Sequence, residues 1–406
     1  MTSLLLLRIV ALLFLVATLP LMTELLVLTI AAWFPAPRKR EGFASEDFPL
    51  TVVIPAHNEQ ALIGRCVRSV KSSINSEIDI LVVAHNCTDA TAKMALDSGA
   101  RVLVLNDMNR RGKGYALNAG FEAAFAGSTE AVLVIDADSV VCSSLITEVK
   151  SRMQNGARVL QCRYEVKNSG DSWRTDVVTL AFHAFNVIRP RGRARLGLSA
   201  GVFGNGFAIH REVLERIPYN AFSIVEDLQY HLDLVRARFR VEFVDDAIVR
   251  GEMPVSSRGA KTQRARWEGG RMQMMMKWAP KLLIEVAKGR VRLAEPLLDL
   301  LSLSITSQIC ALFVLAFMPF DWARWYVCGG LAVLVMHVST AAIDGPGVGR
   351  AIKALISAPG HMLWKVSIFP NIWRAAQPQA AWIRTTRETP AEPKKSDHRL
   401  RTNPIL

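Results

Sequence analysis

A long, almost wholly apolar stretch at the start of the chain constrains its folding more than any other feature. Within residues 4–34 the only interruptions are Arg8, Thr18, Pro20, Thr23, Glu24 and Thr29. The stretch exceeds the roughly 20 residues that a helix needs to cross a bilayer. It is also too long for the apolar region of a cleaved secretory signal. We therefore expect an N-terminal transmembrane helix over residues 1–34.

The residues after this stretch predict its orientation. Arg38, Lys39 and Arg40 form a cationic cluster, and such clusters stay on the cytoplasmic side of a membrane. We expect a basic linker over residues 35–48 and a cytosolic domain over residues 49–255. The chain is thus predicted to be a multi-pass protein of the cytoplasmic (inner) membrane.

The C-terminal part carries further apolar segments. Residues 297–320 and 326–342 have few charges, which predicts a transmembrane hairpin over residues 294–345. Residues 346–383 are interrupted by charges and prolines, so an interfacial segment and a further membrane segment both stay open. The basic tail, 384–406, is expected in the cytosol, which favours an odd number of spans.

Charge and cysteine content exclude some classes of partner. The formal net charge is +13, but no segment resembles a nucleic-acid recognition helix, so anionic lipid and nucleotide diphosphate are the expected partners and nucleic acid is not. The six cysteines have neither a paired metal-ligand spacing nor a dense disulfide framework. We expect reduced thiols and no zinc site.

Between the membrane segments, short apolar runs alternate with helical stretches. Strands are expected at residues 50–55, 78–84, 101–105 and 132–135. This alternation predicts an α/β domain with a mostly parallel sheet and helices on both faces. Because α/β sheets bind ligands at the carboxyl ends of their strands, the polar residues after each strand are candidate site residues.

The fourth run is followed by Asp136, Ala137 and Asp138. Carboxylate oxygens suit Mg²⁺ or Mn²⁺, and such an ion would bridge them to the diphosphate of a nucleotide substrate. An isolated Asp-x-Asp is more often a solvated turn or a helix cap. The motif gains weight from the loops expected beside it.

Three other loops are expected at the same edge. The first strand ends in Pro55, His57, Asn58 and Glu59, the second in Asn86, and the third is followed by Lys113 between Gly112 and Gly114. Ordinary turn chemistry accounts for the asparagines taken singly. For Lys113 the alternatives are a flexible solvated loop and a phosphate-binding loop, in which glycines let the backbone approach the phosphate.

Taken in order, these motifs resemble the inverting family 2 glycosyltransferases, in the membrane-embedded branch of cellulose, chitin, hyaluronan and poly-N-acetylglucosamine synthases. The resemblance covers residues 49–267 and rests on Val53-Ile54-Pro55-Ala56-His57-Asn58-Glu59, Arg111-Gly112-Lys113-Gly114 with Asn118, Asp136-Ala137-Asp138, Gly204-Asn205-Gly206, Val225-Glu226-Asp227 and Gln263-Arg264-Ala265-Arg266-Trp267. It implies a GT-A fold, a mixed sheet with helices on both faces, here flanked by transmembrane helices. It also implies single displacement at the anomeric carbon with inversion.

The resemblance assigns roles to these residues. Asp136 and Asp138 would hold the metal, and Asp227 would be the base that accepts the proton of the acceptor hydroxyl. The expected acceptor-binding residues are Gly204, Asn205, Glu226 and Trp267. The expected nucleotide-sugar-binding residues are Pro55, His57, Asn58, Glu59, Asn86, Lys113, Asp136, Gln263, Arg266 and Trp267. For the acids at 226–227 alone, the alternative is a helix amino terminus, where the dipole favours negative charge.

Gln263, Arg266 and Trp267 have helical spacing, so one helix face can present all three. The resemblance places this motif on interfacial helices, here residues 256–293, with Arg266 near the diphosphate and Trp267 stacked on an acceptor sugar. An amphipathic helix anchored at the membrane surface is the alternative. One departure is Asn86, which stands where the family commonly has an acid that binds the base, although an amide can still bond the uracil edge.

Residues 189–195 contain four arginines. They predict a basic loop that touches phosphate, anionic lipid or an anionic acceptor, with a solvated loop as the alternative.

The expected function is metal-dependent transfer of a hexose or N-acetylhexosamine from a UDP-sugar to a hydroxyl of a carbohydrate or lipid acceptor at the cytosolic membrane face. Its product would be a polysaccharide or a glycolipid. The alternative is a catalytically silent, nucleotide-binding membrane subunit of a polysaccharide export or synthesis complex, with export proteins as partners. The enzyme would need the carboxylates of Asp138 and Asp227 for its activity, whereas the silent subunit would keep its cellular role without them.

Overall fold

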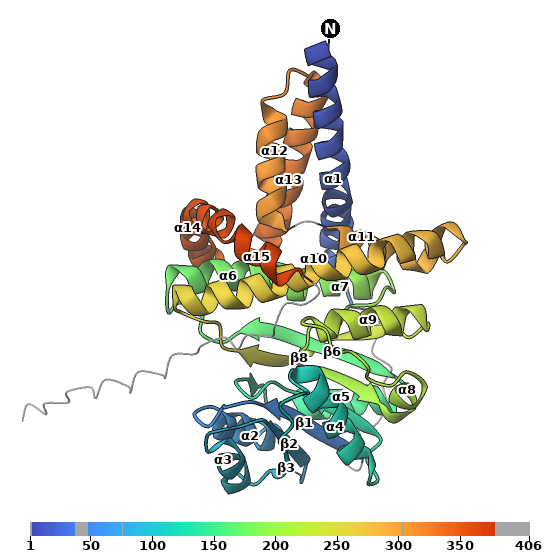
Figure 1. Cartoon of the computed structure of the whole chain (residues 1–406), viewed down its shortest axis with the longest axis vertical. Coiled ribbons are helices and arrows are strands. Elements are labelled where there is room, and N and C mark those ends of the chain that lie inside the picture. The colour runs from blue at the N-terminus through green and yellow to red at the C-terminus, as the bar shows by residue number, and fades with distance from the viewer. Residues whose placement is uncertain (1, 37–47, 75, 303, 378–406) are drawn as a thin grey trace, which may run out of the picture.

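The computed structural model describes residues 2–36, 48–74, 76–302 and 304–377. The cationic cluster at residues 38–40 and the basic tail at 384–406, on which the expected orientation depends, lie outside the described residues. Figure 1 shows the arrangement: an α/β domain at one end, a bundle of upright helices at the other, and a layer of transverse helices between them.

Within the described residues, eight strands form one sheet in the order β3-β2-β1-β4-β7-β6-β8-β5. The strands are β1 (Leu50–Ala56), β2 (Asp79–His85), β3 (Arg101–Leu105), β4 (Ala131–Val134), β5 (Val140–Val141), β6 (Val159–Val166), β7 (Phe207–His210) and β8 (Val241–Gly251). The first four are parallel, whereas β7 runs antiparallel to β4 and β6, and β5 antiparallel to β8. The sheet is therefore mixed, as the family resemblance implied, rather than mostly parallel.

Helices cover both faces of the sheet because successive strand residues point to opposite sides. On one face, Val52 and Ile54 of β1 pack against α2 (Ile63–Lys71), α3 (Thr91–Asp97) and α5 (Leu145–Gln154). On the other face, Val53 packs against α4 (Lys113–Phe125), α8 (Arg211–Arg216) and α9 (Glu226–Arg236). The strands are buried on both sides, which explains their continuous apolar runs.

Transverse helices separate the sheet from the upright bundle (Figure 1). They are α6 (Trp173–His183), η1 (Ala184–Ile188), α7 (Arg189–Arg195), α10 (Ser257–Ala287), η2 (Val291–Leu293), α11 (Ala294–Leu301), α14 (Val348–Ser367) and α15 (Phe369–Ala375). The long helix α10 begins after Ser256, whose hydroxyl accepts a hydrogen bond from the Gly259 N–H. It runs between the sheet domain and the bundle, so its side chains can face either.

The upright helices are α1 (Thr2–Trp33), α12 (Ile305–Ala316) and α13 (Asp321–Asp344). Two of them, α1 and α13, are long and apolar enough to cross a membrane. Leu25, Leu312 and Leu334 pack between the three helices, whereas outward-facing side chains such as Leu13 and Val335 are 64% and 65% exposed. A bundle with an apolar outside as well as an apolar core is suited to lipid rather than water.

The first arm of the hairpin expected over residues 294–345 is bent rather than straight. Two helices, Val291–Leu301 and Ile305–Ala316, meet at a bend of 78°. Ser304 caps the second helix by accepting a hydrogen bond from the Ser307 N–H. The polar break therefore leaves α11 in the transverse layer while α12 enters the bundle.

The expectation of a basic loop at residues 189–195 is wrong. The segment is helix α7, and two of its arginines, Arg189 and Arg193, are buried. Arg189 lies 2.6 Å from Glu24 of α1, and Arg193 lies 2.5 Å from Glu24 and 2.7 Å from Asp299 of α11. Arg193 also pairs with Glu295 at 2.5 Å. Helix α7 thus joins the sheet domain to the bundle by buried ion pairs.

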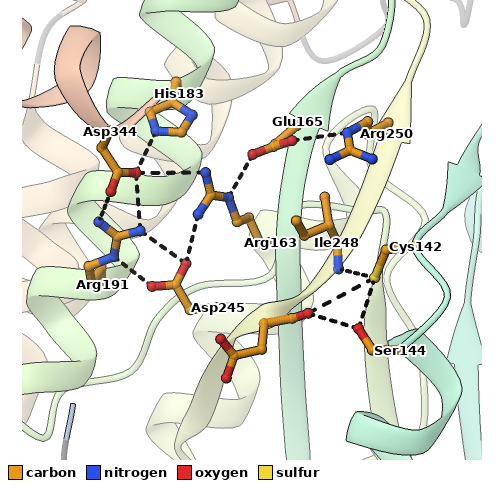
Figure 2. Close-up of polar contacts among 11 residues, drawn as sticks. Cys142, Ser144, Arg163, Glu165, His183, Arg191, Asp245, Ile248, Arg250 and Asp344 are labelled. Atoms are coloured by element: carbon orange, nitrogen blue, oxygen red, sulfur yellow. Dashed lines mark hydrogen bonds and ion pairs between the residues drawn. The ribbon is translucent and has the colours of Figure 1, made fainter. Parts of the chain in front are cut away.

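A second network anchors the end of α13. Figure 2 shows Asp344 between His183 and Arg191, at 2.8 and 2.7 Å. Arg191 continues to Asp245 of β8 at 2.6 Å, and Asp245 to Arg163 of β6 at 3.3 Å. The last turn of a candidate membrane helix is therefore tied to two strands of the sheet.

Candidate active site

The acidic loop after β4 is held from several sides. Asp136 donates its backbone N–H to the side-chain oxygen of Asn205 at 3.0 Å, and its carbonyl accepts from the Cys66 thiol. Arg65 donates to the carbonyl oxygen of Asp138 at 3.3 Å. Asp138 itself is only 7% exposed and lines the cavity described below. The loop is thus fixed by the neighbouring helix α2 and by the loop before β7.

Asn205 was expected to contact the acceptor, but its side chain does not line the cavity. Its side chain is fully buried, accepting from Asp136 and donating to the Ser139 hydroxyl at 2.8 Å. This geometry gives it the task of positioning the acidic loop. Its burial leaves no surface that an acceptor would reach.

Lys113 is the first residue of α4 and points into the acidic loop. Its ammonium group lies 2.5 Å from an Asp136 carboxylate oxygen and 2.5 Å from the Gly204 carbonyl oxygen. Burial alone would lower the pKa of Lys113, but the Asp136 and Glu226 carboxylates outweigh it and raise the pKa. The lysine is therefore a fixed cation among carboxylates, not part of a solvated loop.

Glu226 and Asp227 open helix α9, as the dipole interpretation expected, and they also face the site. The Leu228 N–H donates to Asp227 at 2.8 Å. Gly204 has φ +74°, and a Cβ added there would lie 3.1 Å from an Asp227 carboxylate oxygen, so glycine leaves room for this acid. The expected glycine and the expected base are thus neighbours.

The two acids have perturbed pKa values. Burial and the Asp227 charge raise the pKa of Glu226 to about 7. Burial also raises the pKa of Asp227, against the stabilising effects of the Leu228 N–H and of Lys113. A carboxylate with a raised pKa is a better proton acceptor when it is ionised.

The loops after β1 and β2 are built by side chains that bond across them. Asn58 and Asn86 have φ of 56° and 52°, the left-handed region that asparagine tolerates. The Asn86 amide bridges both backbone groups of Asp107, at 2.7 and 2.8 Å, and Asn58 accepts from the Thr88 N–H at 2.7 Å. The Asn86 amide that was expected to bond the base is thus already engaged in shaping the loop.

His57 belongs to the same wall. Its Nδ1 donates to the His85 carbonyl oxygen at 2.8 Å. Pro55, His57, Asn58, Glu59 and Asn86 all line the same cavity. The predicted nucleotide-side residues are therefore brought together, with their individual roles still predictions.

Helix α10 closes the opposite side. Gln263, Arg266 and Trp267 line the cavity from this helix, as their spacing predicted. The helix approaches α9 closely, since a Cβ added at Gly270 would lie 2.7 Å from a Val225 methyl group. The Trp267 ring packs near Phe182 of α6, with centroids 6.3 Å apart.

One cavity of about 1340 Å³ connects these parts. Asp136, Asp138 and Asp227 all line it. No cluster of three or more metal-ligating side chains occurs among the described residues. Two carboxylates nevertheless fit Mg²⁺ or Mn²⁺, because these ions often take one or two carboxylates and complete their shell with substrate phosphates and water.

Sequence reasoning missed the residues that brace the site from outside the motifs. Arg65 of α2 forms an ion pair with Glu252 at 2.8 Å, and both line the cavity. His85 lines it as well, with burial lowering its pKa. No local pattern marks Arg65 or Glu252, since their partner lies 187 positions away in the chain.

Comparison with known proteins gives a family match. Residues 48–270 match the family described as glycosyltransferase like family 2. A probable glycosyltransferase, YdaM of Bacillus subtilis (strain 168), is 22% identical over 254 residues, which are 60% of this chain and 59% of the relative. Glucomannan 4-beta-mannosyltransferase 7 of Arabidopsis thaliana is 22% identical over 59% of this chain and 46% of its own length. The chain thus spans about three fifths of the first relative and under half of the second.

The fold also matches a solved structure. The mannosyltransferase PcManGT from Pyrobaculum calidifontis, in complex with GDP-Man and Mn²⁺, aligns over 91% of this chain and 97% of its own with a TM-score of 0.53 and 18% sequence identity. This likeness supports the GT-A fold, including the helices outside the sheet domain. The polysaccharide-synthase branch of the resemblance stays a prediction.

Proposed function

The chain belongs to glycosyltransferase family 2, and we propose that it moves a hexose or N-acetylhexosamine from a UDP-sugar to a hydroxyl acceptor at the cytosolic face of a membrane. The observation that carries the proposal is a single cavity. The acidic pair, a fixed lysine and the acids of α9 all face it. These are the groups needed to bind a diphosphate and to activate an alcohol.

The donor side is formed by Lys113 and the acidic loop. Asp138 and Asp136 would hold Mg²⁺ or Mn²⁺, which would neutralise the diphosphate and stabilise it as a leaving group. The Mn²⁺ and GDP-Man of the similar mannosyltransferase support this arrangement. Lys113 holds a positive charge 2.5 Å from Asp136, where the charge of the departing diphosphate would grow.

The acceptor side is formed by Asp227. An alcohol is a weak nucleophile near neutral pH, so the carboxylate takes its proton as the oxygen attacks the anomeric carbon. The new oxygen–carbon bond forms while the bond from that carbon to the diphosphate oxygen breaks, and the electron pair leaves with the nucleoside diphosphate. Attack opposite the leaving group inverts the anomeric centre.

Arg266 and Trp267 are proposed to complete the site from α10. Arg266 lowers the pKa of Glu226, so it lies close enough to influence the acids of α9. A guanidinium suits a diphosphate, and an indole suits the face of a sugar ring. Both contacts would be made from a helix already packed against α9.

The test is a screen of the purified full-length chain against nucleotide sugars with Mg²⁺ or Mn²⁺ and membrane lipid, recording released nucleoside diphosphate. We expect one donor to be turned over, chelation by EDTA to stop the reaction, and either ion to restore it. Asp138→Asn and Asp227→Asn should lose turnover while keeping the thermal unfolding midpoint of the parent. A silent nucleotide-binding subunit predicts the opposite, with both variants supporting the cellular phenotype.

A further inference from the structure

The cavity is larger than one nucleotide sugar and one small acceptor need. Its volume of about 1340 Å³ exceeds the roughly 300–1,000 Å³ usual for ligand pockets. Beyond the acids of α9 and the face of α10, its lining continues onto α1, α12, α13 and α14. This second part, which we call the upper chamber, is lined by Leu21, Leu25, Ile309, Val338, Leu355 and Ala358.

Three of the six residues that line the upper chamber come from the helices suited to a membrane, and Leu355 and Ala358 come from the transverse helix α14. Val338 comes from α13, and Leu21 and Leu25, which are 2% and 0% exposed and form the chamber's packed back wall, come from α1; these are the two helices long and apolar enough to cross a bilayer. Ile309 comes from α12, which packs against both of them. Part of the chamber's lining therefore belongs to the helices that acyl chains would surround.

Charges at the floor of the chamber are balanced. The arginines Arg189, Arg193 and Arg271 are paired with the carboxylates Glu24, Glu295 and Asp299. A floor with matched charges has no net attraction for a second anion. The aliphatic side chains of the chamber suit a hydrocarbon chain better than they suit the many hydroxyls of a long glycan, and the polar groups beside them are few, chiefly the hydroxyls of Ser304, Thr306 and Ser307.

We propose, on the basis of the function above, that the acceptor is a membrane lipid with a hydroxyl head group. Its hydrocarbon chain would lie in the upper chamber, and its hydroxyl would reach Asp227. A hydroxyl fits the acids of α9 better than a lipid phosphate does, because two adjacent carboxylates repel a phosphate and an alcohol needs a base. The product is then a glycolipid released back into the bilayer.

The first experiment follows the labelled sugar. The full-length protein in detergent receives the donor that supports turnover, radiolabelled in the sugar, together with a lipid extract of the membranes in which it was made. We expect label in the chloroform-soluble fraction, and its loss when the hydroxyls of the extract are acetylated beforehand. Label in high-mass, chloroform-insoluble material, or transfer that ignores acetylation, overturns the lipid acceptor while leaving the sugar transfer intact.

The second experiment narrows the upper chamber with a matched pair of variants on α14. Leu355 lines the cavity and is 50% exposed, whereas its neighbour Ile356 is 75% exposed and lies off the cavity. Leu355→Trp should lower lipid glycosylation by at least about tenfold, as small changes in apolar pockets do. It should leave UDP binding unchanged, as measured by fluorescence titration. Ile356→Trp should behave as the parent.

A second matched pair guards against a local folding defect. Val338 of α13 lines the chamber, and Val335, on the same helix, faces outward at 65% exposure. Val338→Trp should repeat the selective loss, and Val335→Trp should not. Equal effects within both pairs would overturn the proposal. If the parent protein neither binds UDP nor turns over any donor, the result would instead refute the proposed function on which the lipid acceptor rests.

Discussion

Replacing Lys113 by methionine tests the electrostatics of the site most directly. The ammonium group contacts one Asp136 oxygen and the Gly204 carbonyl, each at 2.5 Å, and its side chain is 22% exposed. Methionine keeps most of the aliphatic volume and removes the charge. A hydrogen bond to a charged group is worth about 1.5–3 kcal/mol, which corresponds to a loss of about 10- to 150-fold in kcat/KM if the contact is realised in the transition state.

The same variant carries a second, independent signature. Lys113 lowers the pKa of Glu226 and of Asp227, so its removal should raise both. Because transfer requires the ionised base, activity falls as the pH drops through that pKa. The acid limb of the pH profile should therefore move to higher pH in Lys113→Met.

Nucleoside diphosphate release, measured across pH 5 to 9, gives both quantities. Lys113→Arg, which keeps a positive charge, should recover part of the rate and the position of the limb. Lys93→Met on the exposed face of α3 is the control and should match the parent. A fall in rate with an unmoved acid limb would show that the lysine acts only through packing, and an unchanged rate would refute its role at the diphosphate.

Three further outcomes follow from the same geometry. Glu226→Gln removes the carboxyl group whose pKa burial and the Asp227 charge raise to about 7, so the step near neutral pH that Glu226 contributes to the kcat/KM profile should disappear; a profile that keeps this step contradicts the assignment. Arg189→Met leaves Glu24 with Arg193 as its remaining cation and Asp299 with Arg193 and Arg271, so it should destabilise the protein in thermal unfolding in detergent by less than the about 3–5 kcal/mol of a fully broken buried pair, whereas exposed Arg292→Met should not destabilise it; equal midpoints for the two variants would refute the role of the buried pair. Asn205→Ala leaves the buried Asp136 N–H without its partner and removes one of the two hydrogen bonds of the Ser139 hydroxyl, so it should cost about 1–3 kcal/mol of stability and weaken UDP binding in the presence of Mn²⁺; unchanged stability and affinity would argue against its positioning role.

Strands β1 to β4 could be predicted from the sequence because the apolar runs and the polar residues that bound them indicate the same strand ends. The third strand was expected at residues 101–105 and is β3 (Arg101–Leu105), and the others fall within a residue or so of the expected ends. Each is a run of apolar, mostly β-branched residues bounded by polar loops. The gathering of Asp136, Lys113 and the β1 and β2 loops also followed, since parallel strands bring their carboxyl ends to one edge.

The antiparallel strands β5 and β7 could not be predicted from the local sequence pattern. Strand β7 has four residues and β5 has two, too few for a periodicity to stand out. Their places are decided by pairing with distant strands, as in the register of Val134 with Phe207. The resemblance to a mixed-sheet family supplied what the pattern of apolar residues did not.

The arginines of α7 show the physical limit most clearly. A run of basic residues ordinarily indicates a solvated surface, because burying an unpaired charge is very unfavourable. Here Arg189 is buried because Glu24, 165 positions earlier, and Asp299, 110 positions later, reach it at 2.6 Å. Only the folded chain brings these partners together.

This pairing has a consequence for the cavity that links the site to the bundle. Helix α7 packs directly against α1, since a Cβ added at Gly192 would meet the Leu28 backbone at 2.2 Å, and no larger residue fits without a shift. The ion pairs of Arg189 and of Arg191 then hold α1, α11 and α13 against the sheet domain. Because a domain held by buried ion pairs on several elements cannot pivot without separating charges, the upper chamber and the acids of α9 keep a fixed relation. An acceptor lipid would therefore have to move to the base, rather than the base to the lipid.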